Sequence, residues 1–351
     1  MFDANFSRWA VFAHKDDTGL GRQATDVRAV LGLGHHLVIP SERLQDHPID
    51  GVSERRLPAD ASPESVRSLL SGLDGILFFE RHAWHPHILQ IARDMGVATV
   101  CVPNWEWFKG NAPEWQFCDF FVCPSRFTEK IVRSYGFTNT CYLPWPIDLT
   151  KLPPRRIIGP ARHFIHNAGL VDIDDRKGTR DTILAFSRLK RSDIRLTVRL
   201  QKPTTLPPLD DRVTIEVGNL KCVSDLYSTG DICVQPSKME GIGFMVLEPA
   251  CAGMPVITTD YPPMSDYVQQ PELRCRPRWR KRRAFASQWI KQAHLKLPNI
   301  RDLSRRMDWA ASTDLSTISA ANRHWAETTF NPEALRTAWS QTLVRLITCR
   351  G

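Results

Sequence analysis

The stretch "SKMEGIGFMVLEPACAGMPVITTD", residues 237–260, places a glutamate near one end and another in the middle of a segment that is otherwise mostly glycine and apolar. Just before it, "DICVQPS" (231–237) is a short apolar run typical of a buried strand, and "PVITT" (255–259) is a second such run. Between them, "FMVLEPACAG" (244–253) predicts a helix that ends at a glycine. The order of strand, loop, helix and strand is that of one unit of a parallel α/β sheet.

This order gives Glu240 a definite place. It lies in the loop at the carboxyl end of the first strand, where Gly241 and Gly243 leave backbone amides accessible. The following helix directs its N-terminus toward the same loop, and amides together with the positive end of a helix dipole attract anions. A carboxylate beside such a site can accept hydrogen bonds from sugar hydroxyls. Glu248 lies within the helix and faces the same side if its apolar neighbours face the sheet.

The rest of the chain repeats the alternation of strands and helices. In the first part, strands are predicted at 8–14, 35–40, 75–80, 97–103 and 118–125, with helices at 19–34, 87–96 and 126–136. In the second part, strands are predicted at 163–169, 194–200, 212–218, 231–237 and 255–259, with helices at 179–190 and 244–253. Continuous apolar strands separated by helices indicate parallel sheets covered on both faces.

Five prolines in residues 143–160 predict a stiff linker between two domains, in keeping with a chain of 351 residues. We expect domains at 1–150 and 151–330. The last seventy residues read as wholly helical, and we expect 331–351 to form a helix that packs back on the first domain. Two such sheets that face each other would bind ligands in a cleft between the domains, at the carboxyl ends of their strands.

Composition is that of an ordinary globular protein, with 42% hydrophobic and 24% charged residues. No apolar run approaches the roughly 20 residues that span a bilayer, and the N-terminus lacks the features of a signal peptide. The nine cysteines stand singly, which favours buried free thiols in a reducing compartment, so a cytoplasmic location is expected. His82, His85 and His87 could form a metal cluster, but without cysteine or carboxylate partners at metal spacing we favour polar caps at a helix start and predict no metal.

The net charge of +8 is concentrated in "RCRPRWRKRR", residues 274–283, where seven of ten residues are Arg or Lys. Such a run is usually a solvated face, but it can also contact a polyanion, either nucleic acid or an anionic membrane. Trp279 within the run suits base stacking as well as phosphate contacts. The candidate contacts are Arg276, Arg278, Arg280, Lys281 and Arg282.

The segment from Glu240 to Glu248 resembles the E-x7-E signature of retaining GT-B glycosyltransferases, most like family 4. The resemblance covers about residues 8–265 and implies two Rossmann-like domains. It also implies a nucleotide-sugar donor, with UDP or GDP as the expected nucleotide, and no cofactor. By the resemblance, Glu240 approaches the donor sugar and Glu248 binds the ribose. The loop amides that would meet the sugar and the diphosphate are those of Gly241, Ile242, Gly243 and Phe244.

"HNAGLVDIDDRKGTRDTILAF" (166–186) resembles the family's opening of the nucleotide-binding domain. There a basic pair before a glycine, here Arg176 and Lys177, neutralises the diphosphate leaving group. The family commonly has G-R after the first strand of this domain, whereas Gly169 is followed by Leu170. One expected cation is therefore missing, and Arg180 or Arg162 are the candidates to replace it.

The N-terminal "DDTGLGRQATDVRAVLGLGHHLVIP" (16–40) resembles the family's first glycine-rich loop, in which Gly19 and Gly21 would approach the donor phosphate or the acceptor. Asp17 could meet an acceptor hydroxyl, although a solvated turn is an equal reading. Many relatives carry a histidine after a middle strand of this domain. No histidine is in register here, and Asn104 or Glu106 is the candidate for that place, or else "NWEW" (104–107) forms an aromatic wall of the acceptor pocket.

The resemblance implies metal-independent transfer with retention at the anomeric carbon. The acceptor stays open between a hydroxymethylated base in DNA, as in some phage enzymes, and a saccharide or lipid of envelope or natural-product synthesis. For the second acceptor class, the basic run could also hold the protein at an anionic membrane. A catalytically silent nucleotide-sugar-binding protein on the same fold is a further alternative.

Overall fold

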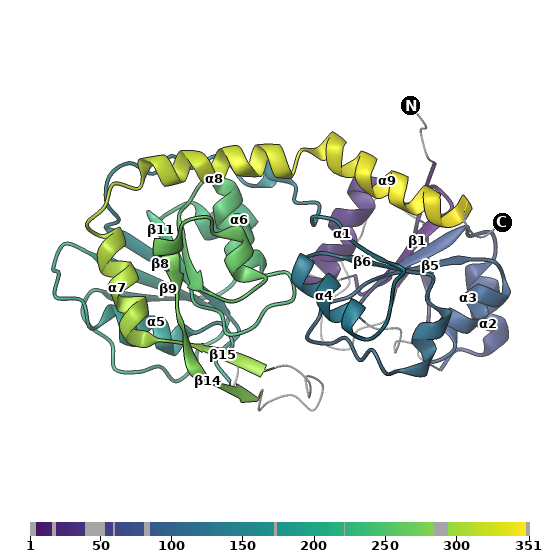
Figure 1. Cartoon of the computed structure of the whole chain (residues 1–351), viewed down its shortest axis with the longest axis horizontal. Helices are drawn as coiled ribbons and strands as arrows, with labels where there is room; N and C mark the ends of the chain where they lie inside the picture. Colours follow the sequence, from purple (N-terminus) through teal and green to yellow (C-terminus); the bar gives the residue numbers. More distant parts are fainter. Residues whose placement is uncertain are drawn as a thin grey trace. The chain divides into compact units, whose positions relative to one another are not determined.

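The computed structural model describes residues 5–15, 19–38, 53–58, 60–80, 85–171, 174–220, 222–283 and 294–348 (Figure 1). The chain forms two compact units. Unit 1 comprises Met1–Ile147 and Phe330–Gly351, and unit 2 comprises Asp148–Thr329. Unit 2 is therefore continuous in sequence, whereas unit 1 takes its last helix from the far end of the chain.

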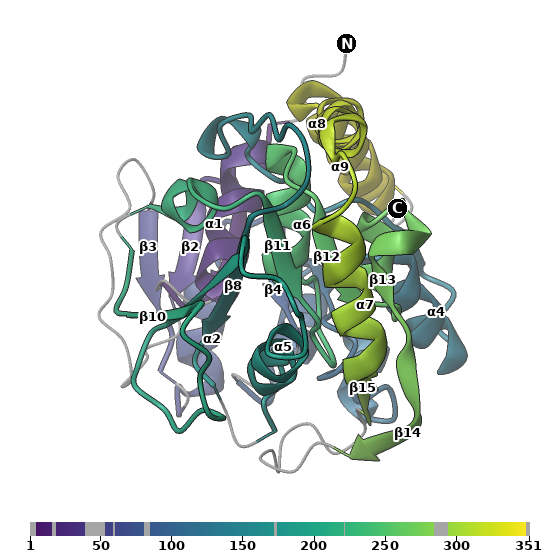
Figure 2. The ribbon, with the colours of Figure 1, turned by 90° about the vertical axis from the view of Figure 1, so that its left-hand side faces the viewer.

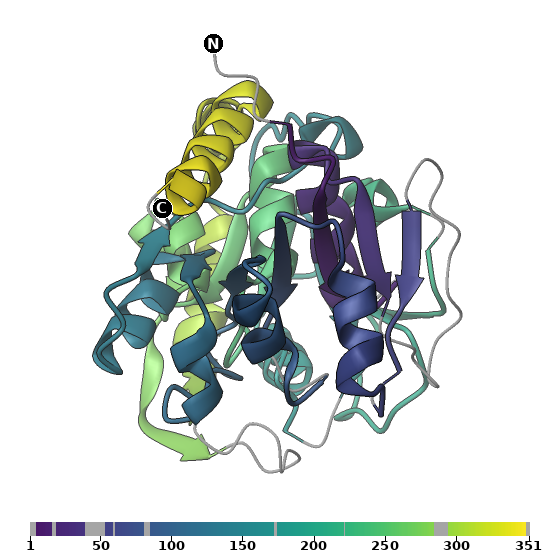
Figure 3. The same cartoon turned by 90° about the vertical axis from the view of Figure 1, so that its right-hand side faces the viewer.

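Unit 1 is built on a parallel sheet with strand order β3-β2-β1-β4-β5-β6-β7 (Figure 3). The apolar strands β1, β4 and β5 are buried along their whole length, as expected for a parallel sheet with helices on both faces. The strand order reverses between β1 and β4, and ligands of such folds bind outside the carboxyl ends of the strands at this point. The elements are β1 (Trp9–Ala13), α1 (Gly19–Leu31), β2 (His35–Val38), β3 (Ser53–Arg56), α2 (Pro63–Leu70), β4 (Gly75–Phe79), α3 (Ile88–Asp94), β5 (Ala98–Val102), β6 (Phe120–Cys123), α4 (Arg126–Ser134) and β7 (Thr140–Tyr142).

Unit 2 is built on a second parallel sheet, with strand order β10-β9-β8-β11-β12-β13 (Figure 2). The chain steps from β8 to β9 in one direction and from β11 to β12 in the other. Because such crossovers are right-handed, the connecting helices α5 and α6 cover opposite faces. Helix α7 packs beside α5, and α8 packs beside α6. The elements are β8 (His163–Gly169), α5 (Thr179–Phe186), β9 (Arg195–Leu200), β10 (Val213–Val217), β11 (Ile232–Gln235), α6 (Phe244–Ala252), β12 (Val256–Thr259), β13 (Arg274–Cys275), α7 (Ile300–Ala310) and α8 (Ser316–Thr329).

Short 3-10 turns complete the two units. They are η1 (Pro113–Phe117), η2 (Leu149–Lys151), η3 (Val223–Tyr227), η4 (Met264–Tyr267) and η5 (Pro271–Leu273). The predicted α/β architecture of two parallel sheets is confirmed. Among the described residues, no helix combines the length and the hydropathy needed to cross a bilayer.

The expectation that the last seventy residues are wholly helical is wrong at their start. β14 (Pro277–Arg283) and β15 (His294–Pro298) form a separate antiparallel two-stranded sheet. Leu295 is fully buried, and the main chain of Lys296 is tied to the loop that precedes α6, so tertiary contacts hold this segment extended. The helix prediction on 285–293 falls outside the described residues.

Helix α9 (Pro332–Thr348) belongs to unit 1 and contacts α1 (Figure 3, α1 in purple and α9 in yellow). The fully buried Trp339 anchors it. The indole nitrogen of Trp339 donates to the carbonyl of Pro144 at 3.2 Å, and its ring meets that of Trp145 edge-on, 6.1 Å between centroids. The last helix thus packs on the first half of the chain through Trp339, which contacts Pro144 and Trp145 at the start of the linker.

Candidate functional site

The Glu240 loop connects β11 to α6 at the carboxyl end of the unit 2 sheet. Gly243 occupies the N-cap position of α6 with φ of 87°, a left-handed conformation that favours glycine. Because this residue has no side chain to cap the helix, the first amides of α6 stay directed at the loop. Most of the loop is nevertheless buried, including Met239, Glu240 and Ile242. A fixed carboxylate thus lies beside a helix N-terminus, as the sequence predicted.

Two cations surround the carboxylate of Glu240. The Nζ atom of Lys177 donates to Oε1 at 2.6 Å, and a guanidinium nitrogen of Arg176 lies 3.6 Å from Oε2. The Glu240 side chain is only 5% exposed. Burial raises the pKa of Glu240, but the charges of Lys177 and Arg176 outweigh it and hold the pKa below its usual value. Glu240 is therefore ionised at neutral pH.

The loop between β8 and α5 carries Arg176 and Lys177 and is called the cationic loop below. Its shape depends on Asp175 and Gly178. Asp175 has φ of 48°, and its carboxylate accepts from the amides of Thr179 at 2.8 Å and Arg180 at 3.1 Å. These bonds cap α5, a role that aspartate performs well. Gly178 has φ of 75°, and a Cβ atom at this position would lie 2.6 Å from the carbonyl oxygen of Pro236. Only glycine lets this loop approach the Glu240 loop so closely.

Lys238 joins three segments at this point. Its buried Nζ lies 3.2 Å from Asp175 Oδ2 and 3.1 Å from Asp181 Oδ2. Its amide donates to the carbonyl of Arg176 at 2.8 Å, and its carbonyl accepts from the amide of Lys296 in β15 at 2.9 Å. The cationic loop, the Glu240 loop and β15 are therefore linked through one residue.

His166 on β8 links β11 to the start of α5, directly after the cationic loop, through its two ring nitrogens. Its Nδ1 lies 2.7 Å from the carbonyl oxygen of Val234, which can only accept, so Nδ1 carries the proton. Its Nε2 then accepts from the hydroxyl of Thr179, the first residue of α5, at 2.9 Å. Burial lowers the pKa of His166 to about 4, so the ring is neutral at neutral pH.

Glu248 is buried within α6, where its neighbours Val246 and Leu247 are also buried. The hydroxyl of Tyr227 in η3 donates to Glu248 Oε2 at 2.7 Å. The carboxylate assigned to the ribose is thus held by a tyrosine. A ribose hydroxyl at Glu248 has to share the carboxylate with this phenol or replace it.

The comparisons with known proteins agree with this geometry. Residues 163–291, which contain the Glu240 loop, the cationic loop and Glu248, match the family model of the glycosyl transferases group 1. This part of the chain is thus similar to a group 1 glycosyltransferase domain. A GDP-mannose-dependent alpha-(1-6)-phosphatidylinositol dimannoside mannosyltransferase of Mycobacterium tuberculosis (strain ATCC 25177 / H37Ra) is 23% identical over 274 residues, covering 64% of this chain and 71% of that protein.

Solved structures show the same fold over nearly the whole chain. A glycosyltransferase from Rickettsia africae ESF-5 matches with a TM-score of 0.70 at 12% identity, covering 97% of this chain and 98% of its own. Sucrose-phosphate synthase from Thermosynechococcus elongatus matches with a TM-score of 0.67 at 14% identity, covering 97% and 99%. These structures confirm the predicted GT-B fold. The match of residues 163–291 to the family model, together with the mycobacterial relative, supports sugar transfer as the class of activity.

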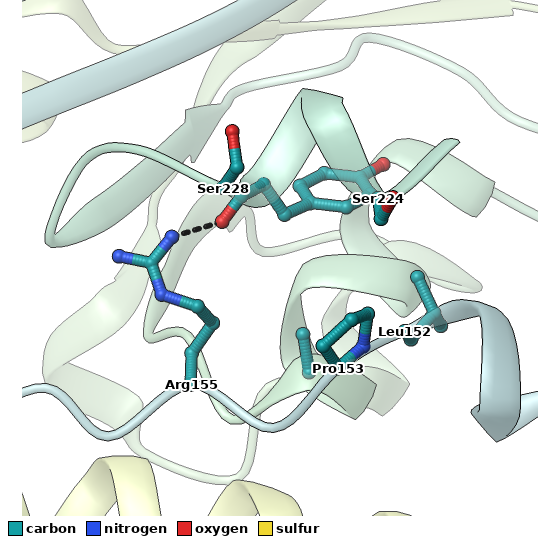
Figure 4. A pocket seen from close by; sticks show the side chains of 7 residues that line it. Leu152, Pro153, Arg155, Ser224 and Ser228 are labelled. Atoms are coloured by element: carbon teal, nitrogen blue, oxygen red, sulfur yellow. Dashed lines mark hydrogen bonds between the residues drawn. The ribbon is translucent and has the colours of Figure 1, made fainter. Parts of the chain in front are cut away.

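A small cavity of about 190 Å³ lies in unit 2, at the C-terminal end of α6 (Figure 4). It is lined by Leu152, Pro153, Arg155, Ser224, Tyr227, Ser228 and Ala252. Arg155 donates to the main-chain carbonyls of Tyr227 and Gly230, so it ties the linker to η3 and to the turn that follows η3. The cavity is below the usual 300 Å³ of a small-molecule site, too small for a nucleotide sugar. Ala252 ends α6, whereas the Glu240 loop precedes the first residue of that helix, and Glu240 is not among the lining residues.

Leu170 takes the place of the expected arginine and is 60% exposed. Gly169 before it has φ of 62°. Arg162 is wrong as a replacement, since it precedes β8 and Gly169 ends that strand, about 20 Å away at the usual strand rise. Arg180, in the first turn of α5, follows the cationic loop and donates to the carbonyl of Thr205 at 3.4 Å.

The predicted site residues of unit 1 lie in two regions, at the start of α1 and after β5. Gly19 and Gly21 belong to the first turn of α1, and Asp17 lies outside the described residues. Asn104 follows β5 and donates to the carboxylate of Glu80 at 2.8 Å, and both Asn104 and Glu106 are buried. Glu80 directly follows β4 and has φ of 61°, a conformation that non-glycine residues rarely adopt. Glu80 was missed from the sequence, because nothing in "GILFFE" marks a left-handed residue.

The remaining predictions concern histidines, cysteines and the basic run. His85 is bonded to the carbonyl of Ala61 at 2.9 Å, His87 takes the N-cap position of α3, and His82 lies outside the described residues. Within the described ranges, no group of three or more potential ligands could hold a metal, and the cysteines there are free thiols. Arg276, Arg278 and Arg280 are exposed, whereas Lys281 and Arg282 are placed in β14 by their backbone alone.

Proposed function

We propose that the protein transfers a sugar from a nucleoside diphosphate sugar, with UDP or GDP as nucleotide, to a hydroxyl group of a saccharide or lipid-linked acceptor, with retention at the anomeric carbon. The observation that carries this proposal is the buried, ionised Glu240 between Lys177 and Arg176. A cationic pair beside a helix N-terminus suits a diphosphate, and the fixed carboxylate among them suits the sugar hydroxyls.

The residues have distinct tasks in this reaction. Lys177, Arg176 and the amides of Gly241, Ile242, Gly243 and Phe244 hold the diphosphate. Glu240 orients the sugar and Glu248 binds the ribose. The bond between the anomeric carbon and the phosphate oxygen breaks, the acceptor oxygen bonds to that carbon from the same face, and its proton passes to the leaving diphosphate. The protein contributes fixed charges, which lower the barrier because they need no reorganisation, and no metal ion is required.

The acceptor is proposed from the chemistry of the relative. The mycobacterial protein is named for a phosphatidylinositol dimannoside, a glycolipid, and no comparison favours the DNA base that the basic run suggested. A glycolipid or polysaccharide hydroxyl is therefore the better supported acceptor. The half-buried Glu80 after β4, together with the buried Asn104 and Glu106 after β5, suits a neutral, hydroxyl-rich molecule.

The test is donor turnover with a panel of UDP- and GDP-sugars, with product configuration read by NMR. Glu240→Gln and Lys177→Met each lower turnover at least ~100-fold, as is common when a fixed electrostatic group is lost. Glu272→Gln, an exposed glutamate of the same unit, is the matched control and keeps wild-type turnover. Turnover near wild type in a folded Glu240→Gln variant, or an inverted product, contradicts the proposal. If no donor is turned over while nucleotides bind tightly, the protein is a catalytically silent nucleotide-sugar-binding protein.

A further inference from the structure

The two-stranded sheet of β14 and β15, here called the basic ribbon (residues 277–283 and 294–298), has no role in the donor site described above. It projects from unit 2 (Figures 1 and 2). Trp279 on β14 is 96% exposed, so almost no protein atom contacts its ring. A large apolar side chain this exposed is unusual, and it is flanked in sequence by the exposed Arg278 and Arg280.

The local backbone accounts for the exposure of Trp279. The pairing of β14 with β15 is regular from Lys281 to Arg283, but the register shifts between Pro277 and Lys281. Trp279 lies within this irregular stretch, and such bulges redirect side chains out of the sheet. Arg278 fixes the bulge, because its Nε donates to the carbonyl of Pro298 at 3.1 Å. The other side of the ribbon is anchored in the protein by Leu295, which is fully buried.

We propose that the basic ribbon docks unit 2 on an anionic phospholipid surface, with Trp279 at the level of the headgroups and arginines on the lipid phosphates. Tryptophan prefers the membrane–water interface, where its ring is partly apolar and its N–H remains hydrated. Each Lys or Arg close to an anionic leaflet contributes about 1 kcal/mol of attraction. Five of the seven residues 277–283 are Lys or Arg, so the charge of the ribbon complements such a surface.

A lipid surface fits the ribbon better than a nucleic acid does. Proteins that stack bases on aromatic rings do so in a basic groove that follows the phosphate backbone. At 96% exposure, Trp279 has no second wall beside it, and it stands on a projecting strand. A flat, continuous anionic surface is the partner that such a projecting aromatic can enter.

The ribbon is attached to the candidate donor site by main-chain hydrogen bonds. The amide of Lys296 in β15 donates to the carbonyl of Lys238, whose amide in turn donates to the carbonyl of Arg176. Lys238 is two residues before Glu240. Docking of the ribbon therefore holds the Glu240 loop close to the lipid surface. The benefit of docking for the reaction rests on the proposed lipid-linked acceptor, whereas docking itself depends only on the basic ribbon.

The experiment is co-sedimentation of the full chain with phosphatidylcholine vesicles, with and without phosphatidylglycerol, in the absence of donor and acceptor. Wild type binds only the anionic vesicles, and binding weakens as salt is added. Arg280→Gln lowers the partition coefficient about fivefold, the equivalent of about 1 kcal/mol. Trp279→Ser lowers it by at least about as much, and removes a blue shift in tryptophan emission that wild type shows on binding.

Two matched controls keep the partition coefficient of wild type. They are Ile158→Ser, which removes an exposed apolar side chain elsewhere in unit 2, and Arg336→Gln, which removes an exposed arginine of α9. Failure of wild type to bind anionic vesicles overturns the inference, and so does equal binding by Trp279→Ser. Salt-sensitive binding to duplex or single-stranded DNA that exceeds vesicle binding and is lost in the same two ribbon variants also overturns it.

Donor hydrolysis in the absence of vesicles separates this inference from the proposed function. Trp279→Ser and Arg280→Gln hydrolyse the donor at the wild-type rate, because neither residue belongs to the donor site. If hydrolysis is absent in wild type while vesicle binding follows the pattern above, the proposed reaction fails and the docking surface stands. If wild type hydrolyses the donor but does not bind anionic vesicles, the proposed reaction stands and the docking surface is rejected.

Discussion

Removal of the Lys177 ammonium group tests whether this cation serves the diphosphate or only neutralises Glu240. In Lys177→Met, Glu240 loses its partner at 2.6 Å and keeps Arg176 at 3.6 Å. Breaking a fully buried pair by removing one partner costs about 3–5 kcal/mol. Lys177 is 19% exposed and Arg176 remains, so we expect a smaller loss in unfolding free energy, about 1–3 kcal/mol, measured by denaturant titration.

The loss of diphosphate binding is a separate quantity. A hydrogen bond to a charged group is worth about 1.5–3 kcal/mol, so UDP or GDP should bind Lys177→Met roughly tenfold to a hundredfold more weakly than wild type. Isothermal titration calorimetry on Lys177→Met, Glu240→Gln and the double variant measures this. If Lys177 contacts the diphosphate, the weakening is the same in the Glu240→Gln background, because the interaction does not pass through Glu240.

The opposite outcome has an equally definite form. If Lys177 only compensates the charge of Glu240, replacing that charge with a neutral amide removes the need for the cation. The double variant then binds the nucleotide as tightly as Glu240→Gln alone. That result would refute the assignment of Lys177 to the diphosphate and leave Arg176 and the helix N-terminus as the anion site.

Three further predictions follow from the buried groups. The pKa of His166 falls to about 4 in the folded state, so unfolding free energy declines as pH drops from 6.5 towards 4, by about 3 kcal/mol, and His166→Asn flattens this slope in denaturant titrations at several pH values. Tyr227→Phe leaves the buried Glu248 short of a donor and lowers unfolding free energy by about 1–3 kcal/mol, whereas unchanged stability argues that another donor replaces the phenol. Gly178→Ala forces a Cβ against the carbonyl of Pro236 and lowers unfolding free energy by at least about 1 kcal/mol, which a wild-type thermal transition would contradict.

The sequence predicted the strands because the buried ones are short, continuous apolar runs. Among the strands that it missed are β3, "SERR", which is mostly exposed, and β15, whose extended backbone depends on a hydrogen bond to Lys238. Periodicity reports how a segment buries its own side chains. It does not report a main-chain bond to a loop sixty residues away.

The candidate site was predictable to a similar extent. The sequence analysis proposed Glu240 from its place between a strand and a glycine-rich helix start, and Arg176 and Lys177 from the resemblance to the glycosyltransferase family. Lys238 and Tyr227 were missed, since an isolated lysine or tyrosine has no signal in the sequence. Their importance arises only when two loops and β15 meet around Lys238, or when η3 lies against α6. The residues that hold a site together are harder to predict from sequence than the residues that line it, because their role depends on contacts that form only in the folded chain.

The charges at the site favour the proposed route for the acceptor proton. Arg176 and Lys177 bring two positive charges, Glu240 offsets one, and the N-terminus of α6 adds about half a charge. A bound nucleoside diphosphate sugar carries two negative charges, so these groups leave the donor slightly under-compensated. When the sugar leaves, the diphosphate gains a third negative charge that nothing in this set can balance. Uptake of the acceptor proton by the diphosphate prevents that excess, which is why a site with this charge needs no separate base close to Glu240.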